Sequence, residues 1–356
     1  MSEGRLSEGE RTVAASPVTD PFLNVAVVGA GAFGRNHLRV YRDLQQRGQA
    51  VRLAAIVEPE PSRAASLTEE WGAPVYPSIE ACLEARARGE IHLDSASICV
   101  PTSAHYQAAA PLLAAGIDLL VEKPIAADTF QAADLLAFAQ KYNRILAVGH
   151  LERFNPAVTA IHPWLNRPMF FEAHRLSVFT PRALDVDVVL DLMIHDLDIV
   201  LSFVKSPIRS LHAVGLPILS SKVDIANVRI EFESGCVANF TASRVSTERV
   251  RKLRFFQPHQ YISIDYARQD LLVIDVDPTA SPTPAFPGLP PGLALRKPPI
   301  QSGEPLLLEM ESFLECVRTR QAPRVSAQEG LAALALALDI NAAIAAHAQR
   351  AGLDRL

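Results

Sequence analysis

The sequence contains little cysteine and no excess of positive charge. Its four cysteines, at positions 82, 99, 236 and 316, form no C-x-x-C pair. They therefore predict neither a disulfide framework nor a zinc-ribbon site, and they suit a reducing cytoplasm. Lysine and arginine together number 34 against 39 acidic residues, which gives a net charge of −5. A chain without a basic excess is not expected to bind nucleic acid.

The chain also lacks a segment typical of export or of membrane insertion. Residues 1–20 contain no apolar stretch, so they do not resemble a signal peptide and are expected to form a mobile tail. The apolar run at 331–348 is interrupted by Asp339 and Asn341, which favours a buried helix over a membrane span. We expect a cytoplasmic protein without membrane contact. Its 356 residues, 49% of them hydrophobic, predict two globular domains.

Short apolar strands alternate with helical patterns in the first half of the chain. This alternation predicts a Rossmann domain, a doubly wound parallel sheet, over residues 21–149. Fully apolar strands agree with a sheet that is covered by helices on both faces. The expected strands are 25–28, 52–57, 74–76, 95–100, 118–121 and 145–148, and the expected helices are 33–47, 62–71, 78–88, 104–115 and 129–142.

A different pattern begins near residue 150. Apolar and polar residues alternate on both sides of Ser234–Gly235, which predicts a hairpin with one buried face. Further strands are expected at 251–256, 261–265 and 271–274. We therefore predict that residues 150–356 form an α/β domain with an open, mostly antiparallel sheet. Eight prolines in 277–300 predict an irregular loop, and helices at 306–320 and 326–350 are placed to pack back on the first domain.

A glycine-rich loop follows the first predicted strand. Residues 25–34 read V-A-V-V-G-A-G-A-F-G and lead into a helix. Gly29 suits a tight turn, Gly31 a close approach to a pyrophosphate and Gly34 close packing of helix on strand. Glu58 ends the second strand, where a carboxylate binds a ribose 2′-hydroxyl and repels a 2′-phosphate, so NAD is the expected cofactor. The predicted cofactor-binding residues in this region are Gly29, Gly31, Ala32, Phe33, Gly34 and Glu58.

Two more loops follow strands at the same expected edge of the sheet, where open α/β sheets bind ligands. The first carries Pro101, Thr102 and His105, and the second carries Glu122 and Lys123. We expect all five residues to contact the cofactor. The alternative is that Thr102 caps a helix, His105 lies on the surface and Glu122–Lys123 is an exposed pair.

These three loops resemble the Gfo/Idh/MocA family of NAD(P)-dependent oxidoreductases. The family pattern continues with Asp-x-x-x-His on a helix of the second domain, here Asp191 and His195. The resemblance covers about residues 22–350. It implies a Rossmann domain, a second domain with an open sheet, and an active site between them.

A narrower resemblance concerns the substrate. Segments 149–156, 190–198, 224–227 and 236–244 look like the nucleotide-sugar branch of the family. In particular they resemble bacterial UDP-N-acetylglucosamine 3-dehydrogenases, which supply a 3-amino sugar for lipid A. The resemblance implies oxidation of a secondary alcohol at C3 of UDP-N-acetylglucosamine. Competing interpretations are a dehydrogenase of a free polyol or sugar, and a nicotinamide-binding regulator that would not need a catalytic set.

The catalytic residues expected from this pattern are Lys123, Asp191 and His195. Histidine suits the removal of a hydroxyl proton near neutral pH, so His195 is expected to be the base. Asp191 is expected to orient its ring or to hold a substrate hydroxyl, and Lys123 to stabilise the developing alkoxide. Burial would lower the pKa of Lys123, which leaves this lysine as an alternative base. No metal site is expected.

A nucleotide diphosphate needs cationic and polar partners. Guanidinium groups match phosphate oxygens, and each such arginine is alternatively an ordinary surface residue. Arg244 and Arg251 would equally suit a sheet–sheet interface in a homodimer or homotetramer. The predicted substrate-binding residues are Arg153, Asn155, Arg175, Arg182 and Arg244.

Overall fold

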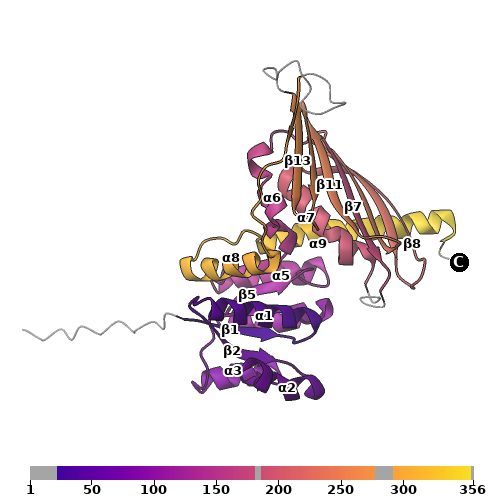
Figure 1. Cartoon of the computed structure of the whole chain (residues 1–356). Coiled ribbons are helices and arrows are strands. Elements are labelled where there is room, and N and C mark those ends of the chain that lie inside the picture. Colours follow the sequence, from indigo (N-terminus) through magenta and orange to yellow (C-terminus); the bar gives the residue numbers. More distant parts are fainter. Residues whose placement is uncertain (1–21, 181–185, 277–291, 354–356) are drawn as a thin grey trace, which may run out of the picture.

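The structure is a computed structural model, and it describes residues 22–180, 186–276 and 292–353. The expected tail at 1–20 and Arg182 lie outside the described residues. Two sheets stand one above the other along the molecule, with helix α8 (Pro305–Thr319) crossing between them (Figure 1).

The first sheet is parallel and has six strands in the order β3-β2-β1-β4-β5-β6. The strand order reverses between β1 and β4, which are neighbours in the sheet. The three predicted loops emerge at the edge formed by the carboxyl ends of the strands. The doubly wound sheet is therefore confirmed. Its elements are β1 (Leu23–Val28), α1 (Ala32–Gln46), β2 (Val51–Val57), α2 (Pro61–Trp71), β3 (Val75–Tyr76), α3 (Ile79–Ala87), β4 (Ser95–Ile98), α4 (His105–Ala114), β5 (Asp118–Glu122), α5 (Thr129–Lys141) and β6 (Leu146–Gly149).

Helices from the end of the chain complete both faces of this sheet. On one face, Met310 and Phe313 of α8 join Tyr41 of α1 in a single apolar cluster. On the other face, Leu334 of α9 (Ala327–Ala351) joins the cluster of α3, α4 and α5. The C-terminal helices thus pack on the first domain, as expected. Helix α9 is long and apolar enough to cross a membrane by length and composition, and in this structure it packs against protein.

The second sheet has eight strands in the order β14-β13-β12-β11-β7-β10-β9-β8. Only the β7–β10 pair is parallel among its described pairings, so the mostly antiparallel sheet is confirmed. One expectation was wrong, because β14 lies inside the segment 277–300 that was expected to be irregular throughout. The strands are β7 (Phe170–Val178), β8 (Ile208–Leu216), β9 (Ile225–Phe232), β10 (Val237–Ser246), β11 (Val250–Gln257), β12 (Gln260–Asp265), β13 (Asp270–Val276) and β14 (Leu293–Arg296).

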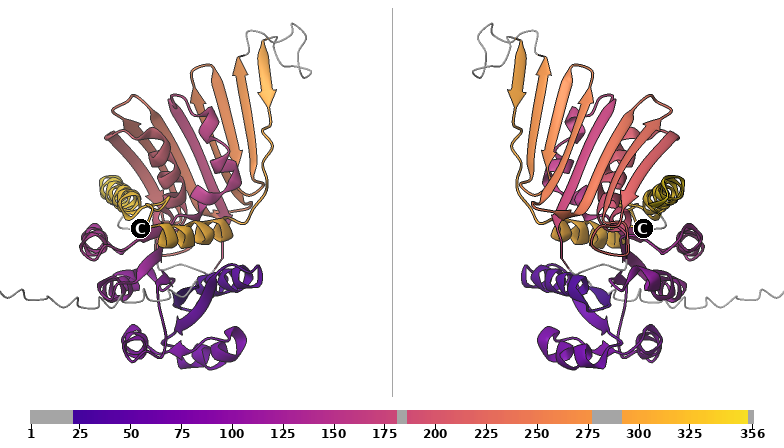
Figure 2. Two further views of the ribbon diagram at one scale, coloured as in Figure 1. Left: turned by 90° about the vertical axis from the view of Figure 1, so that its left-hand side faces the viewer. Right: turned by 90° about the vertical axis from the view of Figure 1, so that its right-hand side faces the viewer.

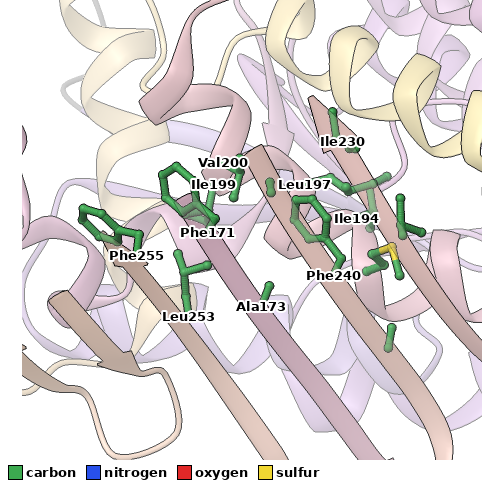
Figure 3. Close-up of a cluster of buried hydrophobic side chains, with 14 of the residues drawn as sticks. Phe171, Ala173, Ile194, Leu197, Ile199, Val200, Ile230, Phe240, Leu253 and Phe255 are labelled. Atoms are coloured by element: carbon green, nitrogen blue, oxygen red, sulfur yellow. The ribbon is translucent and has the colours of Figure 1, made fainter. Parts of the chain in front are cut away.

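The two faces of the second sheet differ. Its inner face packs on α6 (Pro156–Thr159), α7 (Ile194–Val204) and α9, and alternate strand residues such as Phe171, Phe240 and Phe255 fill that core (Figure 3). None of the described helices packs on the outer face, which is turned to the viewer in the right panel of Figure 2. That face carries polar pairs and an aromatic group formed by Phe170, Phe256 and Tyr261.

Candidate active site

The glycine loop has the backbone geometry that its sequence predicts. Gly29 has a φ of +89°, which favours glycine, and its amide donates to the carbonyl oxygen of Val57. A Cβ on Gly34 would lie 1.8 Å from the carbonyl oxygen of Gly29, so only glycine lets α1 pack this closely on the loop. The space around Gly31 is open within 4 Å. This opening, at the start of α1 where amides are free, is where a pyrophosphate fits.

Glu58 lies at the floor of the cavity beside this loop. Its side chain is 2% exposed and accepts hydrogen bonds from the backbone amides of Ala30 and Glu60. It also accepts a bond from the guanidinium of Arg63. Burial raises the pKa of Glu58, but these hydrogen bonds outweigh it and hold the pKa below its ordinary value. Glu58 is therefore a fixed negative charge at physiological pH.

The loop after β4 is tied to the loop after β5 by His105. The ring is 1% exposed, and its nitrogens lie 2.7 Å from the carbonyl oxygen of Pro124 and 3.0 Å from that of Val100. His105 is thus not a surface residue, and its polar atoms hold the two loops together. Pro101 and Thr102 line the cavity beside it.

Glu122 and Lys123 leave β5 in different directions. Glu122 is buried, and its carboxylate lies 3.0 Å from the ring of His37. Lys123 reaches toward the second domain, where its Nζ donates to the backbone oxygen of Asp191 at 2.8 Å and lies 3.7 Å from Oδ1 of the same residue. Both residues line the cavity, so the alternative of an exposed Glu–Lys pair is wrong.

Lys123, Asp191 and His195 line one cavity of about 640 Å³. Residues 189–193 form a π-helical turn that leads into α7, a local form common at functional sites. Asp191 pairs with Lys123 in this arrangement. No hydrogen bond joins Asp191 to His195 among the described contacts, which differs from the expected orienting role.

Both candidate bases have lowered pKa values. Burial lowers the pKa of His195 well below its ordinary value, and the charges of Lys123 and Arg175 lower it further. Burial also lowers the pKa of Lys123, and the nearby Asp191 opposes this shift. At neutral pH His195 is therefore neutral and able to accept a proton.

His150 lies behind His195. The two rings meet edge to face with 6.5 Å between their centroids. His150 is 1% exposed, and neither of its ring nitrogens has a described partner. Burial, together with the charges of Lys123 and Arg153, lowers its pKa to about 3. No local motif in the sequence marks this histidine, since its contact with His195 depends on the tertiary fold.

The residues predicted to bind phosphate are mostly engaged inside the protein. Arg153 bonds to Asp198 and Glu329. Arg244 is buried beside Asp224. Asn155 caps α6, where its Oδ1 accepts from the amide of Ala157, and its Nδ2 donates to Glu152 and to the carbonyl oxygen of Tyr266. These three side chains do not line the cavity, so the structure does not bring them to a substrate.

Two other arginines do line the cavity. Arg175 is held by Asp196 and Glu152, at 2.7 and 3.1 Å. Arg251, which faces Arg175 across the β7–β11 pair, has no hydrogen-bond or ion-pair partner among the described residues. Burial and the neighbouring Arg175 lower the pKa of Arg251. From its sequence Arg251 equally suits a sheet–sheet interface, and the pairing of β11 with β7 places it in the wall of the cavity.

Comparison with known proteins agrees with this geometry. Residues 23–150 match the model of the oxidoreductase family with an NAD-binding Rossmann fold, and residues 157–258 match the Gfo/Idh/MocA C-terminal domain. The chain belongs to the Gfo/Idh/MocA family. Fold, cofactor and reaction class follow from this membership: the protein is an NAD-dependent oxidoreductase with an α/β fold.

Individual members of the family differ in how much of this chain they match. The UDP-N-acetylglucosamine 3-dehydrogenase of Acidithiobacillus ferrooxidans is 32% identical over 92% of this chain and 99% of its own. A solved structure of that enzyme superposes with a TM-score of 0.81, at 31% identity, and covers 91% of this chain and 98% of its own. An inositol 2-dehydrogenase of Corynebacterium glutamicum is 34% identical, but over only 38% of each chain.

The family's cofactor fits the residues that are present. A cavity of about 320 Å³ beside Gly29, Gly31 and Glu58 shares the wall formed by Val100 and Pro101 with the larger cavity. The adenosine half of NAD suits the first cavity, and the nicotinamide half suits the second, next to Lys123 and His195. No group of three or more histidine, cysteine or acidic side chains suited to a metal is found in the part of the chain that the structure describes.

Proposed function

We propose that the protein oxidises the C3 hydroxyl of UDP-N-acetylglucosamine to a ketone, with NAD as the electron acceptor, and so provides the precursor of an amino sugar for lipid A. The carrying observation is that one cavity contains Lys123, His195 and Arg251, and that Arg251 has no ion-pair partner among the described residues. The near full-length similarity to a UDP-N-acetylglucosamine 3-dehydrogenase supports the choice of sugar.

Each residue expected around the reacting carbon has a separate role in the oxidation. The ring of His195 takes the hydroxyl proton because it is neutral at neutral pH. The ammonium of Lys123 stabilises negative charge on the reacting oxygen, and Asp191 holds that ammonium in place. When bound, NAD supplies the acceptor for the hydride that leaves the same carbon. The carbon–oxygen bond then becomes a carbonyl.

One of the charged side chains that line the cavity, Arg251, favours an anionic substrate. Lys123 faces Asp191, and Arg175 faces Asp196 and Glu152. Arg251 has no such partner among the described contacts, so an anionic group on the substrate could form an ion pair with its guanidinium. A nucleotide diphosphate provides this charge away from the reacting carbon, where binding energy can orient the sugar.

The test is an assay with NAD and three sugars, namely UDP-N-acetylglucosamine, free N-acetylglucosamine and myo-inositol. Oxidation of a ring carbinol by NAD is expected to be uphill, so an aminotransferase and an amino donor are included to remove the ketone. We expect the 3-amino product, identified by mass and NMR, from the nucleotide sugar. Good turnover of inositol without any C3-oxidised nucleotide sugar would instead support a polyol dehydrogenase, which the partial match to inositol 2-dehydrogenase favours.

A second arm tests the role of Arg251. Arg251→Met is expected to lower kcat/KM for the UDP-sugar roughly tenfold or more, because a charge-assisted contact to phosphate is lost. Turnover of any neutral sugar should change little. Arg249→Met is the matched control, because Arg249 is an exposed arginine two residues away that does not line the cavity. Equal losses on charged and neutral sugars would argue against recognition of an anion.

We further propose that the enzyme works in the cytoplasm as a homodimer or homotetramer that pairs through the outer face of the second sheet. Support comes from that face itself, which none of the described helices covers and which carries the exposed Phe256.

A further inference from the structure

Helix α8 carries a buried acidic side chain that the chemistry described above does not use. Glu309 is 2% exposed, and neither of its carboxyl oxygens has a hydrogen-bond partner among the described residues. A buried carboxyl group without partners is costly as a charge, so it keeps a proton or binds a water molecule. Burial and the charges of Glu122 and Asp198 raise the pKa of Glu309 well above its ordinary value, which favours the protonated form.

Glu309 lies where α8 crosses between the two sheets (Figure 1). Glu122, whose charge acts on Glu309, lines the active-site cavity, whereas Glu309 itself does not. The titratable groups that interact with Glu309 come from four elements, namely Glu122 of β5, Asp198 of α7, Tyr41 of α1 and Cys99 after β4. None of these four can carry a positive charge, which agrees with a carboxyl group that keeps its proton.

A small cavity connects Glu309 with the surface. Its volume is about 10 Å³, which is room for one water molecule, and Glu309, Ser312 and Arg324 are part of its wall. Phe154, Ser312 and Arg324 also line a groove of about 400 Å³. The groove opens to solvent, since Leu308 in its wall is exposed. Glu309 is therefore separated from this groove by a cavity the size of one water.

Polar groups without partners also lie between Glu309 and the catalytic base. Nδ1 of His195 and both ring nitrogens of His150 have no partner among the described residues, and the two rings meet edge to face. The carboxylate of Glu122 lies beside the backbone that leads into His150, because a Cβ on Gly149 would be 2.7 Å from its Oε1. The charge of Glu122 acts on both His150 and Glu309. These side chains thus form a series that leads from the cavity to α8.

Each turnover of the oxidation releases one proton. The hydride passes from the carbon to NAD, and the hydroxyl proton passes to His195, which must lose it before it can act again. Bound sugar and cofactor would close the cavity toward solvent at that stage. We propose that Glu309 is the last group of a proton exit that starts at His195 and ends in the groove beside α8. His150 and Glu122 are the steps between them.

The exit moves one proton per turnover and needs no further reactant. A histidine can accept a proton at one ring nitrogen and release one from the other, so His150 is charged only briefly although its pKa is low. The carboxyl group of Glu309 likewise takes a proton at one oxygen as it releases one from the other. Water molecules complete the steps where no direct hydrogen bond exists. The inference rests on the base role proposed for His195, and it is independent of which sugar is oxidised.

The first measurement compares NADH formation with proton release during a single turnover. The full-length protein is mixed with NAD and a sugar that it oxidises, in weak buffer, and stopped flow follows the absorbance of NADH and of a pH indicator. The variants are Glu309→Gln, which keeps the size of the side chain but removes the acid, and Glu309→Asp, which restores a carboxyl group. Glu315→Gln is the matched control, because Glu315 is exposed on the same helix. Thermal melting verifies folding.

The proton should appear together with NADH in the wild type and in Glu315→Gln. In Glu309→Gln it should appear about tenfold or more later than NADH, when the products leave the cavity, and Glu309→Asp should shorten this delay. A merely structural role of Glu309 would slow both signals together. Simultaneous signals in Glu309→Gln would therefore overturn the proton exit, whatever the effect on kcat.

A second measurement needs no sugar. Infrared spectra of the protein with NAD bound should show the carbonyl stretch of a buried protonated carboxyl group, which Glu309→Gln removes and Glu315→Gln keeps. Should Glu309→Gln not fold, a shift of this band in Glu309→Asp gives the same answer. A band that neither substitution of Glu309 alters would overturn its role as a proton carrier. If another sugar is oxidised in place of UDP-N-acetylglucosamine, the proposed substrate fails and both measurements still decide on the exit.

Discussion

Lys123 and His195 line the same cavity, and the charge of Lys123 helps to lower the pKa of His195. Burial lowers the pKa of Lys123 and Asp191 opposes this shift, whereas His195 has no acidic partner among the described contacts and stays neutral. A charged donor and a neutral acceptor in one cavity suit the removal of a proton from an alcohol.

The first prediction concerns these two side chains. Lys123→Met and His195→Asn should each lower kcat by about 10²–10⁴-fold, while NAD binding measured by calorimetry stays near normal. The acid limb of kcat/KM should lie below pH 6.5, because the pKa of His195 is lowered. Near-normal turnover of His195→Asn would assign the base role to Lys123.

The second prediction concerns His150 and pH. Its folded pKa of about 3 lies below its unfolded value near 6.5, so the unfolded chain binds a proton that the folded protein excludes. The free energy of unfolding should therefore fall, relative to that of His150→Gln, as pH decreases from 6.5 toward 4. The change is up to about 1.4 kcal/mol per pH unit. Urea unfolding at a series of pH values measures it, and a pH-independent difference would contradict it.

The sequence could predict residues whose role follows from a local motif, and not residues whose role depends on a distant partner. Lys123 and His195 reach the cavity as their motifs predict. Arg244 was assigned to substrate, yet it pairs with Asp224, a partner that the chain order does not reveal. Arg251 shows the reverse, since only the pairing of β11 with β7 places it at the site.

At the scale of the element, two glycines of the glycine loop have different roles: one is needed for packing and the other for cofactor binding. Position 34 requires glycine because the backbone of Gly29 lies so close, whereas Gly31 has a negative φ of −67° that other residues also adopt, and open space around it. The loop therefore contains two glycines of different kinds within one motif.

The third prediction follows from this difference. Gly34→Ala should lower the melting temperature clearly, because its Cβ would meet the Gly29 carbonyl oxygen at 1.8 Å. Gly31→Ala should melt close to the wild type but bind NAD more weakly, since a methyl group would stand where the pyrophosphate approaches. Thermal melting and calorimetry measure the pair. An intact melting temperature in Gly34→Ala would contradict the argument.

Elements of the first sheet were predicted closely, because each buried strand and each capped helix carries its own local signal. The helix expected at 78–88, for example, is α3, and the side chain of Ser78 caps it. The π-helical turn before α7 was missed, since residues 189–193 have ordinary helical periodicity. Strand β14 was also missed, because its pairing with β13 outweighs a proline-rich local sequence.

At the scale of the whole molecule, the outer face of the second sheet is the surface to test. The fourth prediction is that light scattering gives a mass well above the 38.7 kDa of one chain, and that Phe256→Glu shifts it toward the monomer. Phe130→Glu is the control, because Phe130 is 87% exposed on the other domain. An unchanged mass in Phe256→Glu would place the interface elsewhere.

The return of α8 and α9 to the first sheet has a consequence for synthesis on the ribosome. The strands and helices up to residue 149 emerge first, but one face of their sheet is covered by Met310 and Phe313, which are translated long afterwards. Until then the nascent Rossmann half presents an unfinished apolar surface beside Tyr41. The two halves therefore mature together, and a fragment ending near residue 150 should need a chaperone or precipitate rather than fold as an independent nucleotide-binding unit.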